Sequence, residues 1–152
     1  MIRKFILATA LLIATTSLAG ADENINPKAM HIYKTPWCGC CQVWTDAMKK
    51  AGYKVTIENV EDLSVIKKLA GVPDKLESCH TAQLGDYTLE GHVPLEAIQR
   101  LMTERPKIKG LAVPGMPQGS LGMGYDPSAK YENYSFTNDR SNEPQVFYKA
   151  GA

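Results

Sequence analysis

Residues 30–52 have the sequence MHIYKTPWCGCCQVWTDAMKKAG, and they set the order of the first elements of the fold. The first five residues form a short strand pattern in which Ile32 and Tyr33 favour the β conformation. A turn at Pro36 follows, and from Cys40 onward apolar residues recur at helical spacing until Gly52 ends the pattern. This sequence predicts a strand that leads through a short turn into a helix, with three cysteines at the junction.

The same alternation continues along the chain. Apolar Leu63, Ile66 and Leu69 mark a second helix, and Gly85-Asp86 marks the turn of a β-hairpin. The order β-α-β-α-β-β-α predicts a single α/β domain whose helices cover both faces of a sheet. After the first strand and helix, the predicted strand, helix, hairpin and final helix span residues 53–60, 61–71, 79–92 and 94–105.

The chain changes character after Pro106, where Gly, Pro, Ser and Asn become frequent. This composition predicts a long irregular segment, and such segments in compact domains are usually functional or disordered. We assign residues 28–126 to the domain, including a methionine-containing loop at 110–126, and residues 127–152 to a C-terminal extension. Within that extension, VFYKA at residues 146–150 is expected to return as an edge strand.

The N-terminus has the features of a secretory signal peptide. The positive residues Arg3 and Lys4 precede an apolar stretch, and the small residues that follow fit a cleavage site directly before Asp22. The alternative is an uncleaved anchor, although the apolar stretch is shorter than the ~20 residues that a spanning helix needs. We therefore predict that residues 1–21 are removed and that the mature protein is located in a bacterial periplasm, without a membrane anchor.

The charges of the chain balance closely, with 17 Lys and Arg against 16 Asp and Glu. No cluster of basic residues stands out, so nucleic acid is excluded as an expected partner. The charge pattern does not indicate a membrane surface either. After cleavage about 130 residues remain, enough for one domain with its own core, and we expect a monomer.

The chain has four cysteines, and in an exported protein four cysteines normally form two structural disulfides. The spacing here argues against that arrangement. Cys40 and Cys41 are adjacent, and Cys38 and Cys40 enclose a single residue, so neither pair has good disulfide geometry. A bond between Cys38 and Cys41 has ordinary spacing, but it leaves Cys40 and Cys79 to be explained.

Cysteines at a first strand-helix junction resemble the thioredoxin arrangement, in which the sequence Trp-Cys-Gly-Pro-Cys occupies this place. Here Cys40 replaces the proline. A helix N-terminus favours thiolates, which suits either a redox dithiol or a metal. In thioredoxin-like folds the residues before the third strand lie against this turn, so Cys79 is expected to join the other thiols; the alternative is a buried, inert cysteine.

Four soft thiolates indicate Cu(I) or Zn(II). Met116 and Met123 are flanked by Gly and Pro, outside any periodic core pattern. We predict that they are thioether ligands, and thioether ligands favour Cu(I) over Zn(II). The alternative is that these two side chains only pack over the site. His92, at a strand end, is a further candidate ligand. His80 is expected to point to the opposite face from Cys79, because side chains alternate along a strand.

The signal peptide, the Cys-x-Cys-Cys turn, the Gly-His-Val-Pro at residues 91–94 and the run GLAVPGMPQGSLGM at residues 110–123 together resemble the CopG-like periplasmic copper-resistance proteins. The resemblance extends over roughly residues 30–123 and more weakly to residue 152. It implies a thioredoxin-like fold that binds several copper ions and contributes to copper resistance, with a change in copper's oxidation state as the family's proposed activity. Other periplasmic copper-handling or electron-transfer proteins are the expected partners. The copper ligands implied by motif matching are Cys38, Cys40, Cys41, Cys79, His92, Met116 and Met123.

Three hypotheses follow from these residues. The first is a polynuclear Cu(I) cluster, in which bridging thiolates let several ions share few cysteines. The second is a thiol-disulfide oxidoreductase, in which Cys38 is the nucleophile and Cys41 the resolving thiol. The third is a structural zinc site, although such sites usually draw their ligands from two separated Cys-x-x-Cys pairs, unlike the distribution here.

Overall fold

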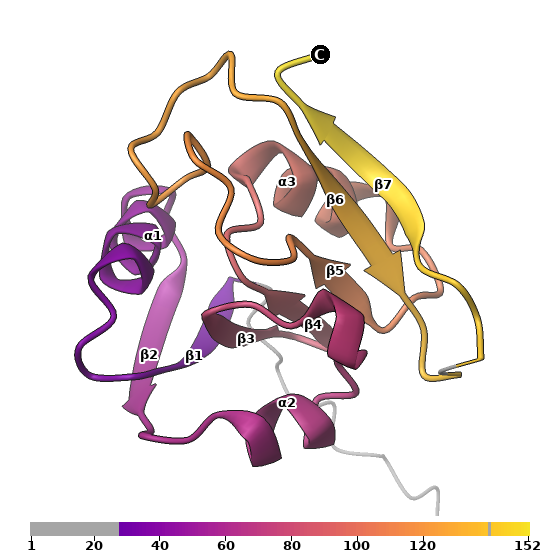
Figure 1. The fold of residues 1–152 in the computed structure, drawn as a ribbon, viewed down its shortest axis with the longest axis horizontal. Coiled ribbons are helices and arrows are strands. Elements are labelled where there is room, and N and C mark those ends of the chain that lie inside the picture. Colours follow the sequence, from indigo (N-terminus) through magenta and orange to yellow (C-terminus); the bar gives the residue numbers. More distant parts are fainter. Residues whose placement is uncertain (1–27, 140) are drawn as a thin grey trace, which may run out of the picture.

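The computed structural model describes residues 28–139 and 141–152, so the predicted signal peptide lies outside the described residues. Within them, seven strands form one sheet in the order β2-β1-β3-β4-β5-β6-β7 (Figure 1). The elements in chain order are β1 (Ala29–Lys34), α1 (Gly39–Lys50), β2 (Lys54–Asn59), α2 (Ser64–Leu69), a short 3-10 helix η1 (Asp74–Leu76), β3 (His80–Leu84), β4 (Tyr87–Glu90), α3 (Leu95–Glu104), β5 (Gly110–Ala112), β6 (Tyr131–Phe136) and β7 (Gln145–Ala150).

The pairing of the first strands determines where the site forms. β1 runs parallel to β2 and antiparallel to β3, and β3 pairs antiparallel with β4. The last residue of β1, Lys34, is the register partner of His80, the first residue of β3. As a result, the turn that leaves β1 lies beside the chain that enters β3, although about 40 residues separate them in sequence.

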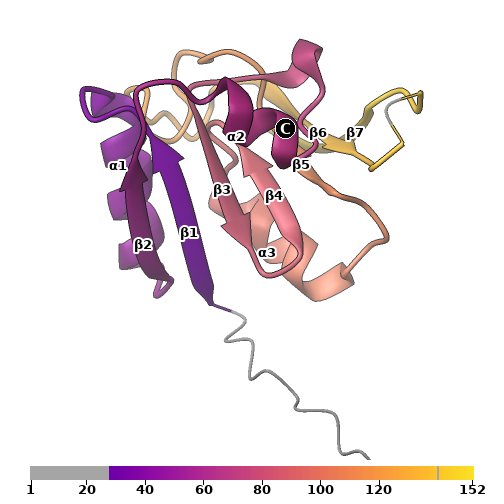
Figure 2. The ribbon, with the colours of Figure 1, turned by 90° about the horizontal axis from the view of Figure 1, so that it is seen from below.

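Helices α1 and α3 cover one face of the sheet, and α2 lies against the other (Figures 1 and 2). The indole Nε1–H of buried Trp44 in α1 donates to the carbonyl oxygen of Val93, just before α3, at 2.9 Å. Met48 of α1 packs with Ile98 and Leu101 of α3 in the main core. The predicted α/β fold with helices on both faces is confirmed. None of the helices in the described part of the chain is long and apolar enough to span a bilayer.

The elements from β1 to α3 agree with the predicted order. β3 and β4 form the predicted hairpin, and Gly85 at its turn has a φ of +55°, a backbone conformation that glycine adopts readily. The helix α2 is shorter than predicted and does not bury all the apolar residues that marked it. Leu63 is buried, whereas Leu69 is 80% exposed and Lys67 is buried instead.

The segment after Pro106 is not irregular throughout, which corrects the sequence-based expectation. β5 pairs parallel with β4, and β6 and β7 then extend the same sheet, so the edge strand predicted at residues 146–150 forms part of β7. At Gly110, the first residue of β5, a Cβ atom would lie 2.0 Å from the carbonyl oxygen of Thr88. A strand that passes this close to its neighbour needs glycine, and glycine in a sequence usually indicates a loop. This is why the sequence predicted an irregular segment where the structure has β5.

Candidate metal centre

The turn between β1 and α1 places three cysteines at the start of a helix. Cys38 is the N-cap residue of α1, and its sulfur accepts a hydrogen bond from the backbone N–H of Cys41 at 3.3 Å. Cys41 lies in the first helical turn and is fully buried, whereas Cys38 and Cys40 are partly exposed. One cysteine of this turn is therefore buried, and the other two are partly exposed.

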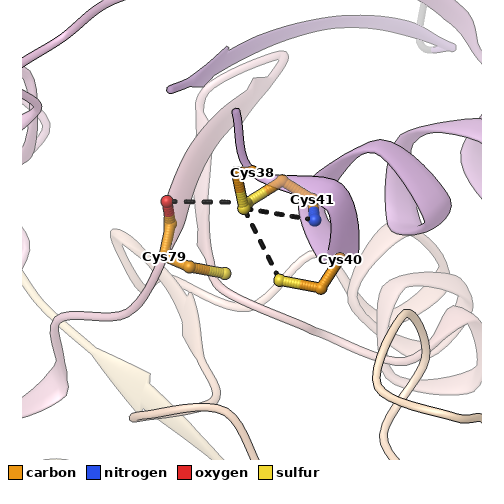
Figure 3. Close-up of side chains that lie close together, drawn as sticks. All are labelled: Cys38, Cys40, Cys41 and Cys79. Carbon is orange, nitrogen blue, oxygen red and sulfur yellow. Dashed lines mark hydrogen bonds between the residues drawn. A yellow bond between two sulfur atoms is a disulfide. The ribbon is translucent and has the colours of Figure 1, made fainter. Parts of the chain in front are cut away.

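Cys38 and Cys41 are joined by a disulfide, and Cys40 and Cys79 are free thiols (Figure 3). The Cys40 sulfur lies 3.5 Å from the Cys38 sulfur, and the Cys41 sulfur lies 3.7 Å from the carbonyl oxygen of Cys79. The four sulfur atoms all lie within 4.8 Å of one another. The predicted convergence of Cys79 with the other three cysteines is confirmed.

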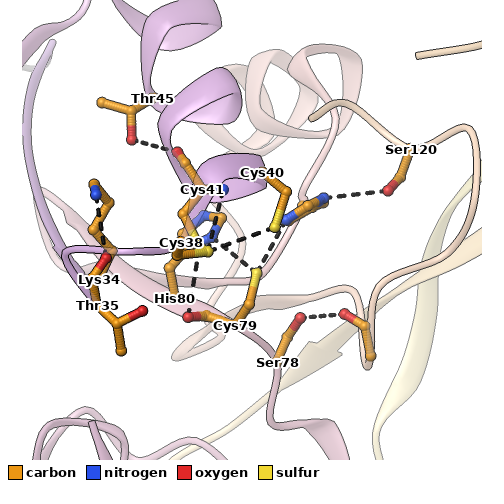
Figure 4. Close-up of a disulfide and its surroundings, with 12 residues drawn as sticks. Lys34, Thr35, Cys38, Cys40, Cys41, Thr45, Ser78, Cys79, His80 and Ser120 are labelled. Carbon is orange, nitrogen blue, oxygen red and sulfur yellow. Dashed lines mark hydrogen bonds between the residues drawn. A yellow bond between two sulfur atoms is a disulfide. The ribbon is translucent and has the colours of Figure 1, made fainter. Parts of the chain in front are cut away.

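A second group of donor atoms adjoins the sulfurs and consists of Cys79, His80 and His92. The Cys79 sulfur lies 3.4 Å from Nδ1 of His80 (Figure 4) and 3.0 Å from Nε2 of His92. Both imidazoles are fully buried, and their ring centroids are 5.4 Å apart. Because Cys79 belongs to both groups, the thiols and the imidazoles form one continuous set of donors.

His80 lies beside Cys79, contrary to the expectation that it points to the opposite face. β3 begins at His80, so Cys79 precedes the extended segment and the alternation of side chains does not apply to this pair. The His80 ring also packs against Trp44, with ring centroids 4.5 Å apart. Its Nε2 atom is buried without a hydrogen-bond partner.

Ser120, in the loop after β5, orients the His92 ring. The Ser120 hydroxyl donates its single proton to the carbonyl oxygen of Pro117 at 2.6 Å, so its oxygen accepts from Nδ1–H of His92 at 3.3 Å. A proton on Nδ1 leaves the lone pair of Nε2 directed at Cys79. Metal-binding imidazoles have this arrangement, with the second nitrogen held by an outer partner. The structure thus places His92 at the site, and its role as a ligand stays a prediction.

Burial controls the protonation of these groups. It lowers the pKa of His92 to about 4, and it lowers the pKa of His80 well below the usual value, with nearby His92 and Lys67 acting in the same direction. Burial also raises the pKa of the Cys79 thiol to about 12, and the neighbouring Cys40 adds to this shift. At neutral pH both histidines are therefore neutral, and Cys79 keeps its proton until a cation displaces it.

We expect the protein to lose stability as the pH falls from 6.5 to about 4. In this window His92 binds a proton in the unfolded chain but not in the folded one, so the free energy of unfolding decreases as the pH is lowered. The share of His92 is about 2–3 kcal/mol. Urea unfolding at neutral pH and near pH 4 measures the loss. The loss of unfolding free energy should be smaller by about 2–3 kcal/mol in His92→Gln than in the wild type. An equal loss in the variant and the wild type would contradict a depressed pKa for His92.

A buried ion pair holds the backbone ahead of Cys79. Nζ of Lys67 in α2 lies 2.5 Å from Oε1 of Glu90 at the end of β4. The same carboxylate accepts the backbone N–H of Ser78 at 2.6 Å and the hydroxyl of Thr81 at 2.7 Å. Burial raises the pKa of Glu90, and the charge of Lys67 opposes that rise. Sequence reasoning missed this pair, although Lys67 lies four residues after a buried leucine, on the same helix face.

The loop after β5 contacts the site through Gly122. Its φ is +102°, and a Cβ atom there would lie 2.7 Å from the carbonyl oxygen of Cys40 and 3.4 Å from the His92 ring. Any other residue would push the loop away. Met123, the next residue, is partly buried, and Met116 is 53% exposed. The role of these two methionines as thioether ligands stays a prediction.

The fold and the site define a small α/β protein in which four cysteines and two histidines converge, a donor set suited to soft metal ions. A family described as proteins of unknown function, DUF411, matches residues 76–123. Two solved structures, named copper resistance protein CopG form 1 and form 2, are each 37% identical to this chain, with TM-scores of 0.73 and 0.72. They cover 83% and 81% of this chain, which in turn covers 99% and 98% of theirs. No curated protein matches. The chain belongs to the CopG-like copper-resistance family, as the sequence resemblance predicted.

Proposed function

We propose that this protein is a periplasmic copper-binding protein that contributes to copper resistance by holding several Cu(I) ions at the cysteine cluster. The observation that carries the proposal is the approach of four sulfur atoms to within 4.8 Å of one another. The name of the two solved relatives, copper resistance protein, supports copper as the cargo. The ligands that we propose are Cys38, Cys40, Cys41, Cys79, His92, Met116 and Met123.

The chemistry of the donors supports copper in both oxidation states. Soft thiolate and thioether ligands favour Cu(I), whereas imidazole suits Cu(II) as well. Thiolates that bridge two ions let a few cysteines hold several, which accounts for the crowding of Cys38, Cys40 and Cys41. We propose that a site with both donor types allows copper to change between Cu(I) and Cu(II).

Thiol-disulfide exchange is a second candidate function, and the disulfide between Cys38 and Cys41 favours it. The partly exposed Cys38 is the sulfur open to attack, and the buried Cys41 is the resolving partner. Metal-free protein that reduces insulin disulfides at a rate comparable to a dithiol oxidoreductase would support this function. The free thiols of Cys40 and Cys79 have no role in it.

The periplasmic location rests on the predicted signal peptide of residues 1–21. Export would deliver the mature chain to the compartment in which copper-handling and electron-transfer proteins are its expected partners. We propose that the mature protein acts as a monomer. Cell fractionation followed by N-terminal sequencing tests the location, with Asp22 expected as the first residue of the periplasmic form.

The metal content of the mature protein tests the copper proposal. The protein is fully reduced, loaded with Cu(I) without oxygen and freed of unbound metal, and copper and alkylatable thiols are then counted in one sample. More than one copper per chain, with the four thiols protected from alkylation, is the expected result. Protein without copper and with accessible thiols would contradict it.

Replacing Cys40 with proline should lower the copper content to one ion per chain or fewer. The change removes a bridging thiolate and leaves Cys38 and Cys41 as a Trp-Cys-Gly-Pro-Cys motif. Cys40 is the second residue of α1, where a backbone N–H has no partner within the helix, so proline is tolerated. Cys40→Ser is the matched control for the backbone change and should lose copper to the same extent. Unchanged copper in both variants would exclude the cluster.

A further inference from the structure

The four cysteines of the cluster do not have the same chemical state. Cys38 and Cys41 are oxidised to a disulfide, whereas Cys40 and Cys79 remain free. We propose that the Cys38/Cys41 dithiol is a two-electron donor that reduces two Cu(II) ions to Cu(I), and that Cys40, Cys79 and His92 then hold the Cu(I) produced. This inference rests on the proposed copper-binding function and assigns the source of the electrons.

The geometry allows a direct transfer from sulfur to metal. The Cys40 sulfur lies 3.5 Å from the Cys38 sulfur, so a copper ion bound to Cys40 lies within reach of Cys38. The Cα atoms of Cys38 and Cys41 are 5.3 Å apart, within the range of ordinary disulfides. The turn at the start of α1 therefore accommodates the oxidised pair at an ordinary disulfide spacing.

The reaction balances without oxygen or another oxidant. The two thiols lose their protons to solvent, and each thiolate gives one electron to one Cu(II) ion. The products are two Cu(I) ions and one sulfur–sulfur bond between Cys38 and Cys41. The thiols of Cys40 and Cys79 and the imidazole of His92 remain as donors. They lie together because the Cys79 thiol contacts Cys40 and lies 3.0 Å from Nε2 of His92. These soft donors favour Cu(I) over Cu(II).

The disulfide must be reduced before a second cycle, and the structure assigns the sulfur through which this happens. Cys41 is fully buried, whereas Cys38 is partly exposed next to Trp37, whose exposed fraction is 70%. A protein dithiol is the reductant that fits. One of its thiolates attacks Cys38 and forms a mixed disulfide, Cys41 leaves as the thiol, and the second thiolate of the reductant releases Cys38. The reductant ends as a disulfide.

The test uses the full mature chain, reduced and metal-free, without oxygen. Copper(II) sulfate is added together with bicinchoninate, a chelator that becomes coloured with Cu(I), and the disulfides formed are mapped by alkylation and mass spectrometry. We expect about two Cu(I) ions per chain, because a disulfide couple carries two electrons, and a disulfide between Cys38 and Cys41. Protein that carries this disulfide from the start should yield at least tenfold less Cu(I).

Two variants separate the electron donor from the retention site. Cys41→Ser cannot form the disulfide, and its Cu(I) yield should fall at least twofold. Cys40→Ser keeps the dithiol, so the Cys38–Cys41 disulfide should still form, but more slowly because Cys40 no longer holds the ion beside Cys38. The chelated Cu(I) and the disulfide should keep the ratio of two to one that a two-electron couple requires. A disulfide between Cys40 and Cys79 in the wild type, or a full yield from Cys41→Ser, would overturn the inference.

Binding of Cu(I) supplied directly distinguishes this inference from the proposed function. If the reduced wild type binds Cu(I) but does not reduce added Cu(II) to Cu(I), the electron-donor inference fails and the copper-binding proposal stands. If the reduced wild type does not bind Cu(I), the copper-binding proposal fails, and with it the inference built on it.

Discussion

Replacing Lys67 with methionine should lower the free energy of unfolding by about 3–5 kcal/mol, because removing one partner of a buried ion pair leaves the other charge uncompensated. The carboxylate of Glu90 is fully buried and would lose its nearest cation. Methionine has a similar length, so little of the loss should come from packing. Urea unfolding at neutral pH measures the change.

The neighbouring Lys68 provides a matched control. It is exposed on the same helix, and Lys68→Met should change the stability by no more than about 0.5 kcal/mol. The loss in Lys67→Met should also be smaller near pH 4, where the unpaired Glu90 takes up a proton. A decrease of less than about 1 kcal/mol in the unfolding free energy of Lys67→Met would show that the Lys67–Glu90 pair does not stabilise the fold.

The same variant has a second expected effect at the site. Glu90 accepts the backbone N–H of Ser78, directly before Cys79. When Glu90 loses Lys67, we expect the segment that carries Cys79 to loosen and its thiol to react faster with an alkylating reagent. Alkylation of Cys40 serves as the internal reference, because Cys40 belongs to α1 and not to this segment.

Replacing Cys79 with serine should weaken Cu(I) binding by more than about a hundredfold. Cys79 is the residue that the thiol group and the imidazole group share, so its loss separates the two sets of donors. Loss of a partner that only orients a metal ligand already costs 10- to 100-fold in affinity, and a shared ligand should cost more. Competition with a Cu(I) chelator of known affinity, without oxygen, measures the change.

Serine is nearly the same size as cysteine, so Cys79→Ser should keep the fold, which thermal unfolding of the metal-free protein checks. Ser78→Ala, one residue earlier, is the matched control. It removes a hydroxyl that donates to the carbonyl oxygen of Gly115 and also interacts with the Cys79 thiol, but it removes none of the proposed copper ligands. A change in affinity below tenfold for Cys79→Ser, or an equal loss in Ser78→Ala, would contradict a shared ligand.

The order of elements from β1 to α3 was predictable because its signals are local. Apolar spacing distinguishes strand from helix over a few residues, and the Gly85 turn depends on its own backbone conformation. The position of Cys38, Cys40 and Cys41 at a helix start follows from the same signals. The approach of Cys79 was predicted only through the resemblance to thioredoxin-like folds.

Other parts of the site depend on contacts between residues far apart in sequence. No local pattern pairs Lys67 with Glu90, and alternation along a strand predicted the wrong direction for His80. Ser120 carries no sequence signal of its own, and its role arises because the loop after β5 lies against His92. The strands β5 and β6 were missed since short, glycine-containing or polar segments become strands only when a partner strand supplies their hydrogen bonds.

The sequence alone was sufficient to predict the α/β class, the strand-turn-helix that carries three thiols and the family resemblance, because these follow from local periodicity and from motifs. The tertiary structure was needed to show one donor set shared through Cys79, the ion pair that holds it and the disulfide that makes its sulfurs inequivalent. The physical reason is that β1 and β3 pair side by side across about 40 residues of chain. Only that pairing brings the sulfur of Cys79 within 4.8 Å of the three sulfurs at the start of α1.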